Sequence, residues 1–358
     1  MKSIQTTTIP VLTLAFALAA LPVGAQPAAS KGAAAGQAAV PVNISNFVRA
    51  ESDLYFGRAV QQNGLGKLGH ERTPANVDDQ KVIRMNRDTL YSSGVFDLDA
   101  GPVTISLPDS PDKRFMSMLV INEDQYVVEV AYAGSGSHTY SLDKVGTRYL
   151  IVLFRTFVDP QDAKDADAVH ALQDAIKVQQ AATGTFEAPN WDKVTQDKAR
   201  DALLTLGSVG GLAPNRFGAK KDVEPVSFVV SAGIGWGGNP NEAAIYLPEF
   251  PKQNDGKTVH KLTLKDVPVD GFWSVSTYNA KGFFEKNELN AYSFNNVTSR
   301  KNADGSMTLQ FGGCGKATPN CMPVVEGWNY LLRLYRPRKE ILDGTWKAPV
   351  AQPAESAQ

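Results

Sequence analysis

The chain has 358 residues and a nearly balanced charge, with 36 Lys and Arg against 37 Asp and Glu. This balance argues against nucleic acid or an anionic membrane surface as the main partner, because both require a basic face. The length exceeds the comfortable size of one hydrophobic core, so it favours two domains.

The N-terminal segment is typical of a signal peptide over residues 1–25. Lys2 precedes an apolar run over residues 9–21, and the small residues Val23, Gly24 and Ala25 offer a cleavage site. The run is shorter than the roughly 20 residues of a membrane-spanning helix. We therefore expect an exported protein, periplasmic or extracellular, with no stable membrane span. Residues 26–44, rich in Ala and Gly, are expected to form a flexible leader.

The first domain is predicted over residues 45–160. Apolar residues at Phe47, Ala50 and Leu54 have helical spacing, which predicts a helix over 46–62. Strands are predicted at 103–107, 115–121 and 126–132, and the last two are joined by a hairpin at 122–124. The acidic residues Glu123 and Asp124 at the hairpin tip are expected to be solvated. Residues 149–158 are almost continuously β-branched and aromatic, which indicates a central strand.

A helical connection is predicted over residues 161–222, with one helix at 165–180 and a second capped by Asn190. The second domain, residues 223–350, is predicted to start its sheet near Val226. Its later strands are expected at 257–264, 272–278, 306–311 and 330–335, and residues 351–358 form a tail. This pattern predicts a mainly β fold with helices (α+β), with two β-sandwich or jelly-roll-like domains joined and flanked by α-helices.

The cysteines and histidines give little support to a metal site. Cys314 and Cys321 close a short loop rich in Gly and Pro, and in an oxidising compartment they are predicted to form a disulfide. The four histidines lie far apart, and no zinc, nucleotide-binding or nucleophile-elbow motif is present. We therefore predict no metal and no cofactor.

Residues 84–92 hold the densest group of polar side chains in the chain. Arg84, Arg87, Asp88 and Tyr91 are the candidate catalytic residues, and Asn86 is a candidate for substrate binding. Arginine offers a bidentate fork to an anionic group, and Asp88 is suited to orient an arginine or to act as a base. The alternative is an Arg–Asp network that secures the start of a strand. The sequence leaves both open and favours the structural network.

Further candidates for substrate binding come from the second half of the chain. Trp236, on a Gly-rich turn, is placed either to stack on a ligand ring or to plug a domain interface. Trp273 is separated by five residues from Tyr278 on one strand, so the two face opposite sides and at least one belongs to the core. The full set of these candidates is Trp236, Asn239, Tyr246, Trp273, Asn290, Tyr292 and Asn295.

Several motifs carry a family resemblance. Residues 84–99, 114–118, 145–149 and 155–159 resemble the bacterial domain of unknown function 1254. Residues 235–240, 270–275, 332–335 and 342–346 resemble the domain of unknown function 1214, its usual partner. The resemblance spans roughly residues 45–350 and implies two β-sandwich-like domains with helical connections, in exported or envelope proteins. It implies no catalytic residues, although some members carry a carboxylesterase-type label.

Two function classes follow. The first is an exported enzyme, a hydrolase or lyase with carboxylesterase-like activity among the options, that acts on a small polar or ester-bearing molecule in a cleft between the domains. The second is a non-catalytic envelope protein that binds a ligand or a partner. The sequence leaves open whether the protein forms a homo-oligomer.

Overall fold

The computed structural model describes residues 38–80, 83–110 and 112–354. The predicted signal peptide, most of the predicted leader and the last four residues lie outside the described residues. Within these ranges, no helix is both long enough and apolar enough to cross a membrane.

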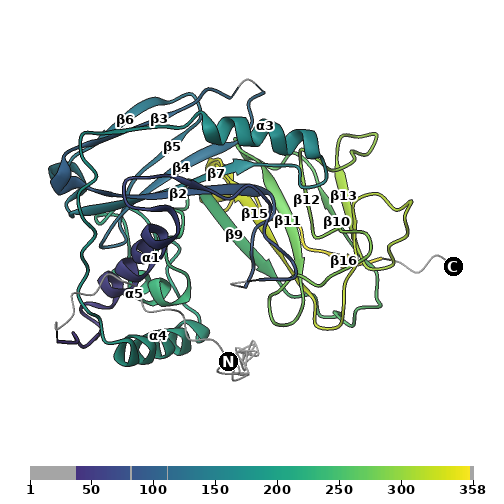
Figure 1. Ribbon diagram of the computed structural model, residues 1–358. Helices are drawn as coiled ribbons and strands as arrows, with labels where there is room; N and C mark the ends of the chain where they lie inside the picture. The colour runs from purple at the N-terminus through teal and green to yellow at the C-terminus, as the bar shows by residue number, and fades with distance from the viewer. Residues whose placement is uncertain (1–37, 81–82, 111, 355–358) are drawn as a thin grey trace, which may run out of the picture.

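The described residues form 16 strands in four sheets, together with six α-helices, which confirms the predicted α+β fold of two sandwiches with flanking helices. In the first sandwich, a five-stranded sheet in the order β1-β2-β7-β4-β5 packs on a three-stranded sheet in the order β6-β3-β8 (Figure 1). These strands are β1 Gly69–His70, β2 Thr89–Asp97, β3 Val103–Leu107, β4 Met116–Asn122, β5 Val127–Tyr132, β6 Gly136–Tyr140, β7 Tyr149–Phe157 and β8 Lys177–Gln180.

Alternation along β7 separates the two faces of the five-stranded sheet. Leu150, Val152 and Phe154 enter the core shared with the three-stranded sheet. Tyr149 and Ile151 point to the opposite face, where they pack in a core with Phe56 of helix α1 (Phe47–Asn63). Side chains two residues apart on a strand share a face. Arg155 therefore lies on the α1 face, further along the strand.

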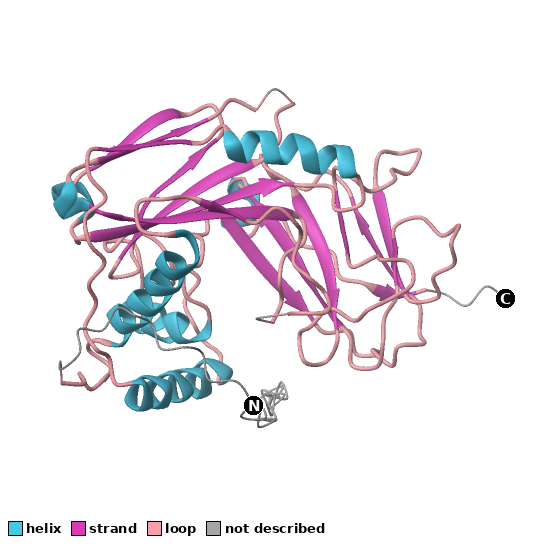
Figure 2. Cartoon of the chain, in the orientation of Figure 1, coloured by secondary structure: helices cyan, strands magenta, loops and turns pink. Residues whose placement is uncertain are grey.

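Helices cover both faces of this sheet. Helices α1, α4 (Lys193–Ser208) and α5 (Pro225–Ile234) pack on one another below it, as Figures 1 and 2 show. Helix α3 (Ala163–Asp174) lies on the other face, where Val169 packs with Leu90 and Val158. The shorter helices are η1 Leu98–Ala100, α2 Leu142–Val145 and α6 Lys339–Leu342.

The second sandwich packs a sheet in the order β12-β11-β15-β9 on a sheet in the order β14-β13-β10-β16. Its core lies between the sheets and contains Trp273, Val275, Leu309, Leu332 and Leu334. The predicted disulfide between Cys314 and Cys321 is formed and joins the loop after β13 to the start of β14. The strands are β9 Ala244–Glu249, β10 His260–Leu264, β11 Trp273–Tyr278, β12 Ser293–Asn295, β13 Met307–Phe311, β14 Cys321–Met322, β15 Asn329–Tyr335 and β16 Gln352–Pro353.

Three predicted features differ from the structure. Helix α4 is capped by Asp192 and not by Asn190, because the Asp192 carboxylate accepts from the N–H groups of Val194 and Thr195. The segment near Val226, expected to begin a sheet, is the first turn of α5. The Glu224 carboxylate accepts hydrogen bonds from the N–H groups of Val226 and Ser227, and Pro225 occupies the first turn, both of which favour a helix start. The helix predicted at 165–180 ends at Asp174, because Lys177–Gln180 instead pair with β3.

The end of the predicted leader is also ordered. The Val40 N–H donates to the Asn190 carbonyl at 2.8 Å, and the Val40 carbonyl accepts from the Asp192 N–H at 2.8 Å. Val42 is buried with Phe47 and other side chains of the helical layer. Burial of Val42 and these two backbone bonds attach residues 40–42 to the fold.

Candidate functional site

The two sandwiches meet across a polar sheet face. Along β15, Leu332 and Leu334 enter the core of the second sandwich, whereas Arg333 and Tyr335 point outward toward the first domain. Arg333 is nevertheless only 2% exposed. The outer face of this sheet is therefore buried by the first domain.

Arg333 holds the candidate segment in place. One guanidinium nitrogen, Nη2, donates to the carbonyls of Arg84 and Met85 at 2.9 and 3.1 Å and to the Tyr278 hydroxyl at 2.6 Å. The other, Nη1, donates to the Ser276 hydroxyl at 2.8 Å. A side chain of the second domain thus satisfies backbone carbonyls that precede β2 of the first domain. This arrangement clasps the two domains together.

Asp88 is fully buried and points at the second domain. Its Oδ1 accepts hydrogen bonds from the Ser293 hydroxyl at 3.1 Å and the Asn295 amide at 3.2 Å, while Oδ2 has no hydrogen-bond partner among the described residues. Burial raises the pKa of the Asp88 carboxyl, and the charge of Arg333 and the polar groups of Ser274, Asn295 and Ser293 offset only part of that rise. Its contacts fit an interdomain anchor.

The predicted Arg–Asp network is wrong in its partners. Within the described ranges, neither a hydrogen bond nor an ion pair joins Asp88 to Arg84 or Arg87. Arg84 lies over the Phe250 ring at 5.4 Å and Arg87 over the Tyr292 ring at 5.1 Å, as cation–π pairs. Burial lowers the pKa of both arginines. Aromatic rings that come from the second half of the chain, which sequence spacing cannot reveal, have taken the place of the expected carboxylate.

Tyr91 belongs to a second polar group, on the α1 face of the first sheet. It is in register with Arg155 of β7, which in turn is in register with Ser117 of β4. The Arg155 guanidinium carbon lies 5.5 Å from the centre of the Tyr91 ring, and its Nη1 is 3.4 Å from the side-chain oxygen of Asn239. Arg155 is only 9% exposed and has no carboxylate partner among the described residues.

Two amides connect three tyrosine hydroxyls at this face. The Asn86 amide donates to the Tyr335 hydroxyl at 3.1 Å and lies 3.5 Å from the Tyr91 hydroxyl. The Asn239 amide donates to the Tyr246 hydroxyl at 2.7 Å. Tyr246 and Tyr335 meet edge to face, with ring centres 6.5 Å apart. We call Tyr91, Arg155, Tyr246 and Tyr335, with these two asparagines, the tyrosine–arginine cluster.

The pKa values of Tyr91 and Tyr335 are shifted in opposite directions. Burial alone would raise the pKa of Tyr91, but the charge of Arg155 and the polar groups of Asn86 and Thr89 lower it below its ordinary value. Burial raises the pKa of Tyr335 well above its ordinary value, and the nearby Tyr246 and Tyr91 add to the rise. The Arg155 guanidinium next to the Tyr91 ring therefore favours the ionised form of this phenol.

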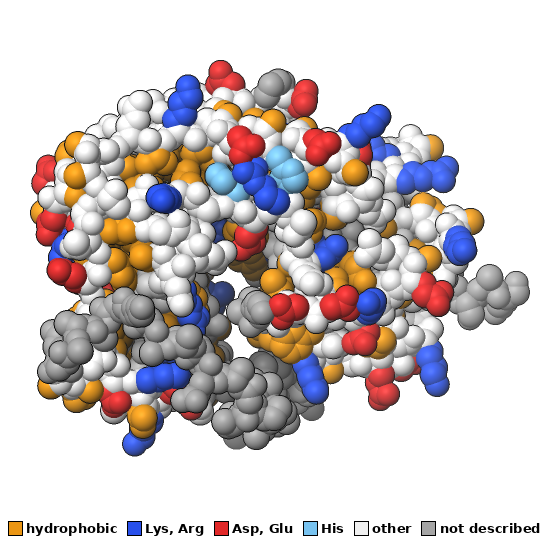
Figure 3. Space-filling model, in the orientation of Figure 1, with side chains coloured by type: hydrophobic (Ala, Val, Ile, Leu, Met, Phe, Trp, Pro, Cys, Tyr) orange, Lys and Arg blue, Asp and Glu red, His pale blue; other side chains and the backbone are white. Residues whose placement is uncertain are grey.

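The outside of the molecule is hollowed between the helical layer and the second sandwich, beneath the first sheet, as Figure 3 shows. Tyr246, at 36% exposure, is the most exposed member of the cluster. Among the described residues, no group of three or more His, Cys, Asp or Glu side chains is arranged to hold a metal ion.

The remaining candidates are scattered. Trp236 stacks on Tyr55 with ring centres 4.8 Å apart and donates from Nε1 to the Ser52 hydroxyl at 3.0 Å. It therefore packs between α1 and the first sheet. Trp273 is buried in the second sandwich core, away from the interdomain face. Asn290 is exposed in a loop with a positive φ of 50°. Tyr292 supports Arg87, as described above.

Sequence reasoning missed Arg155, Arg333 and Tyr335 as site residues. A signal was present, because each arginine is the only charged residue inside an otherwise apolar or hydroxyl-bearing strand. A charged side chain in a buried strand requires a specific partner.

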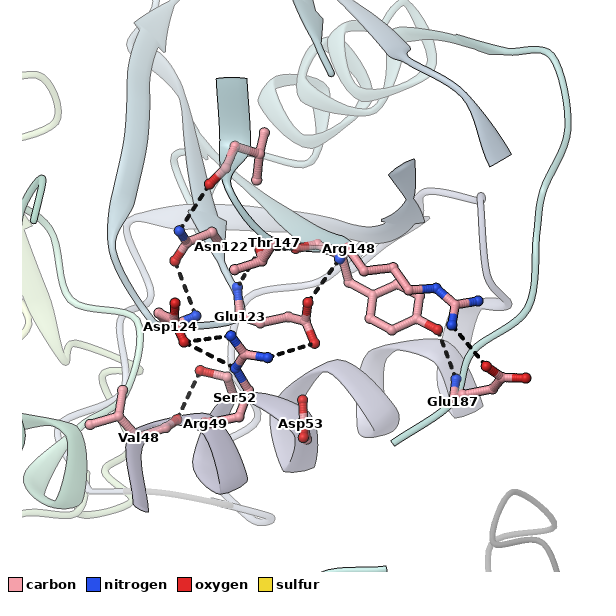
Figure 4. Close-up of polar contacts among 12 residues, drawn as sticks. Val48, Arg49, Ser52, Asp53, Asn122, Glu123, Asp124, Thr147, Arg148 and Glu187 are labelled. Carbon is pink, nitrogen blue, oxygen red and sulfur yellow. Dashed lines mark hydrogen bonds and ion pairs between the residues drawn. The ribbon is translucent and has the colours of Figure 1, made fainter. Parts of the chain in front are cut away.

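A separate polar cluster, around Arg49, holds α1 against the first sheet (Figure 4). Arg49 lies 2.5 Å from the Asp124 carboxylate and 3.6 Å from that of Glu123. The expectation that Glu123 is solvated is wrong. Glu123 is 6% exposed, because it lies between α1 and the sheet, where its carboxylate accepts a hydrogen bond from the Tyr149 N–H at 3.0 Å. Burial raises the pKa of neighbouring Asp53 to about 6. Arg49 of α1 pairs with Glu123 and Asp124 of the turn between β4 and β5, which indicates that this cluster has a structural role.

The fold and the interdomain face define an α+β protein of two sandwiches with a buried polar contact between them. A family model described as "Protein of unknown function (DUF1254)" matches residues 65–144, and one described as "Protein of unknown function (DUF1214)" matches residues 250–339. The chain belongs to the family that pairs these two domains, which confirms the resemblance found in its motifs.

One solved structure shows a similar fold. The VPA0106 protein from Vibrio parahaemolyticus is similar with a TM-score of 0.69 and 17% identity, over 87% of this chain and 98% of that chain. A putative uncharacterized protein from Burkholderia cenocepacia has a TM-score of 0.48 and 12% identity, over 86% of each chain. No curated protein matches the chain.

Proposed function

We propose that the protein is an exported enzyme, of the hydrolase or lyase type, that acts on a small polar or ester-bearing molecule at the tyrosine–arginine cluster. The observation that carries the proposal is the pairing of Tyr91 with the buried Arg155, which lowers the pKa of the phenol. The signal-peptide pattern and the disulfide between Cys314 and Cys321 support export.

Tyr91 is the proposed proton-transfer group. A phenol with a lowered pKa is a better proton acceptor near neutral pH than an ordinary tyrosine. Arg155 stabilises the phenolate and any negative charge that develops on the substrate. Asn86 and Asn239 donate to the hydroxyls of Tyr335 and Tyr246 and so fix their positions.

The charge balance of the interdomain face supports an electron-rich substrate group. The charges of Arg155 and Arg333 both favour the ionised forms of Tyr91 and Tyr335. Among the described residues, Asp88 is the one buried carboxylate in contact with this face. An uncompensated buried cation is costly, so an ester carbonyl or a carboxylate beside Arg155 would be favourable. We assign Asp88 to the compensation of Arg333 rather than to proton transfer.

An activity screen tests the proposal. The protein from residue 26 onward is assayed against esters, lactones and glycosides, with and without a chelator. For any substrate found, Tyr91→Phe is expected to lower kcat by about 100-fold or more, the usual contribution of acid–base catalysis. Arg155→Met is expected to lower kcat by a similar factor.

Tyr126→Phe is the matched control, because the Tyr126 ring stacks on Phe228 at 4.8 Å, outside the tyrosine–arginine cluster. Unchanged turnover by folded Tyr91→Phe contradicts the assignment of Tyr91. Saturable binding without turnover of any compound supports the non-catalytic class instead.

A further inference from the structure

A groove of about 320 Å³, lined by residues of both domains, lies beside the shared face. The first domain contributes Tyr132 of β5, and the second domain contributes Glu242, Asp270 and Arg336 together with two prolines. Tyr132 is in register with Ser117, on the same row of the sheet as Arg155. The Phe115 ring contacts the rings of Tyr132 and Tyr335, with ring centres 6.1 and 5.2 Å apart, and so lies between the groove and the tyrosine–arginine cluster.

The backbone of Arg336 is held in an unusual conformation at this groove. Its φ is +51°, in the left-handed region that non-glycine residues rarely adopt. Two backbone hydrogen bonds fix it, because the Arg336 N–H donates to the Ala243 carbonyl at 2.9 Å and its carbonyl accepts from the Asp270 N–H at 2.8 Å. The conformation places the guanidinium carbon 4.4 Å from the centre of the Tyr132 ring. Strain kept by surrounding contacts is a recurring property of ligand sites.

The groove carries two exposed, opposite charges that have no ionic partner among the described residues. In the part of the chain that the structure describes, the Arg336 guanidinium and the Glu242 carboxylate form neither a hydrogen bond nor an ion pair. Asp270, by contrast, is paired with Arg338 at 2.6 Å. Both free charges act on the Tyr132 hydroxyl, whose pKa is raised by burial, lowered by Arg336 and raised by Glu242. The cation and the anion therefore flank the same phenol.

We propose that this groove binds a small zwitterion of the α-amino acid or dipeptide class. The carboxylate of the ligand pairs with the edge of the Arg336 guanidinium, whose face is occupied by Tyr132. The ammonium group pairs with Glu242. An apolar side chain lies against Tyr132 and the prolines. The volume is at the small end of the range for ligand pockets, which suits one or two residues.

Calorimetric titration of the protein from residue 26 onward tests the proposal, with L-leucine, L-phenylalanine and leucyl-leucine as probes. At least one probe is expected to bind saturably. Its N-acetylated form, which lacks the ammonium group, and its amide, which lacks the carboxylate, are each expected to bind about tenfold more weakly or worse. No saturable binding by any of the three probes overturns the proposal.

Two charge variants assign the groups. Glu242→Gln is expected to remove the preference over the N-acetylated probe, and Arg336→Gln the preference over the amide. Glu340→Gln and Lys339→Gln, exposed positions on α6, are the matched controls and are expected to bind as the wild type does. Retained preferences in the two groove variants overturn the assignment. Should Arg336→Gln fail to fold, Glu242→Gln decides alone.

The result is independent of the proposed enzyme activity. Tyr91→Phe is expected to bind the amino acid probe with unchanged affinity, because Phe115 separates the two sites. Loss of binding in Tyr91→Phe while the fold is retained would place the ligand in the tyrosine–arginine cluster and refute the groove.

Discussion

Arg333 is the residue whose removal should most damage the contact between the sandwiches. Arg333→Met keeps much of the side-chain volume but deletes the buried cation. The carbonyls of Arg84 and Met85 and the hydroxyls of Ser276 and Tyr278 lose their shared donor. Breaking a buried charge arrangement by removal of one partner typically costs about 3–5 kcal/mol. We expect a loss of that size in the free energy of unfolding, measured by urea denaturation.

A double-mutant cycle with Asp88 separates charge from packing. In Arg333→Met the Asp88 carboxylate stays buried without its nearest cation, whereas Asp88→Asn removes that cost. The double variant should therefore be less destabilised than the two single losses added together, with a coupling on the order of 1–3 kcal/mol. Arg338→Met, at an exposed position, serves as the control and should change stability little.

The pH dependence gives the cycle a second readout. Burial raises the folded-state pKa of Asp88 above its unfolded value. The native state then binds more protons, so stability falls as pH rises from the unfolded pKa through the folded one. Loss of Arg333 raises the folded pKa of Asp88 further. The deficit of Arg333→Met should thus be smallest at acidic pH and grow toward neutrality. Additive losses with no change across pH would refute the reasoning.

Three other predictions concern the rest of the fold. Asp53, with a folded pKa of about 6 against 3.8, should cost up to about 3 kcal/mol as pH rises from 4 to above 6, and Asp53→Asn should flatten that part of the stability curve measured by urea unfolding. Reduction of the Cys314–Cys321 disulfide, or its replacement by two alanines, should lower stability by about 2–3 kcal/mol, visible as a lower Tm that reductant no longer shifts in the variant. Trp236→Ala should cost about 3–5 kcal/mol in urea unfolding through lost packing on α1, yet leave any substrate affinity unchanged, in contrast to a ligand-stacking role.

Local patterns predicted most of the strands, because alternation and turn chemistry depend on residues a few positions apart. The hairpin between β4 and β5 and the split of Trp273 and Tyr278 between two faces followed directly from a period of two. The helix at Pro225–Ile234 was missed because its apolar run fits a buried strand equally well. The cap at Glu224 and the proline in the first turn distinguish the two.

The partners of the candidate site were beyond local reasoning. Asp88 bonds Ser293 and Asn295, more than 200 positions away, and the carbonyls before it bond Arg333 across a similar separation. These contacts depend on how one sheet docks on the other, which no sequence period encodes. Charge proximity in sequence instead suggested an arginine pair for Asp88 that the fold does not make.

The structure also changes the choice between a structural network and a site in residues 84–92. Part of the segment is structural, since Arg333 holds the carbonyls of Arg84 and Met85 and Asp88 is fully buried. Two other residues of the segment belong to the tyrosine–arginine cluster, because Asn86 donates to the Tyr335 hydroxyl and β2 sets Tyr91 beside Arg155. Loss of the Arg333 contacts to Arg84 and Met85 therefore moves Tyr91 relative to Tyr335. For this reason Arg333→Met, although it leaves the proposed proton-transfer group intact, should lower kcat in its folded fraction as well as stability.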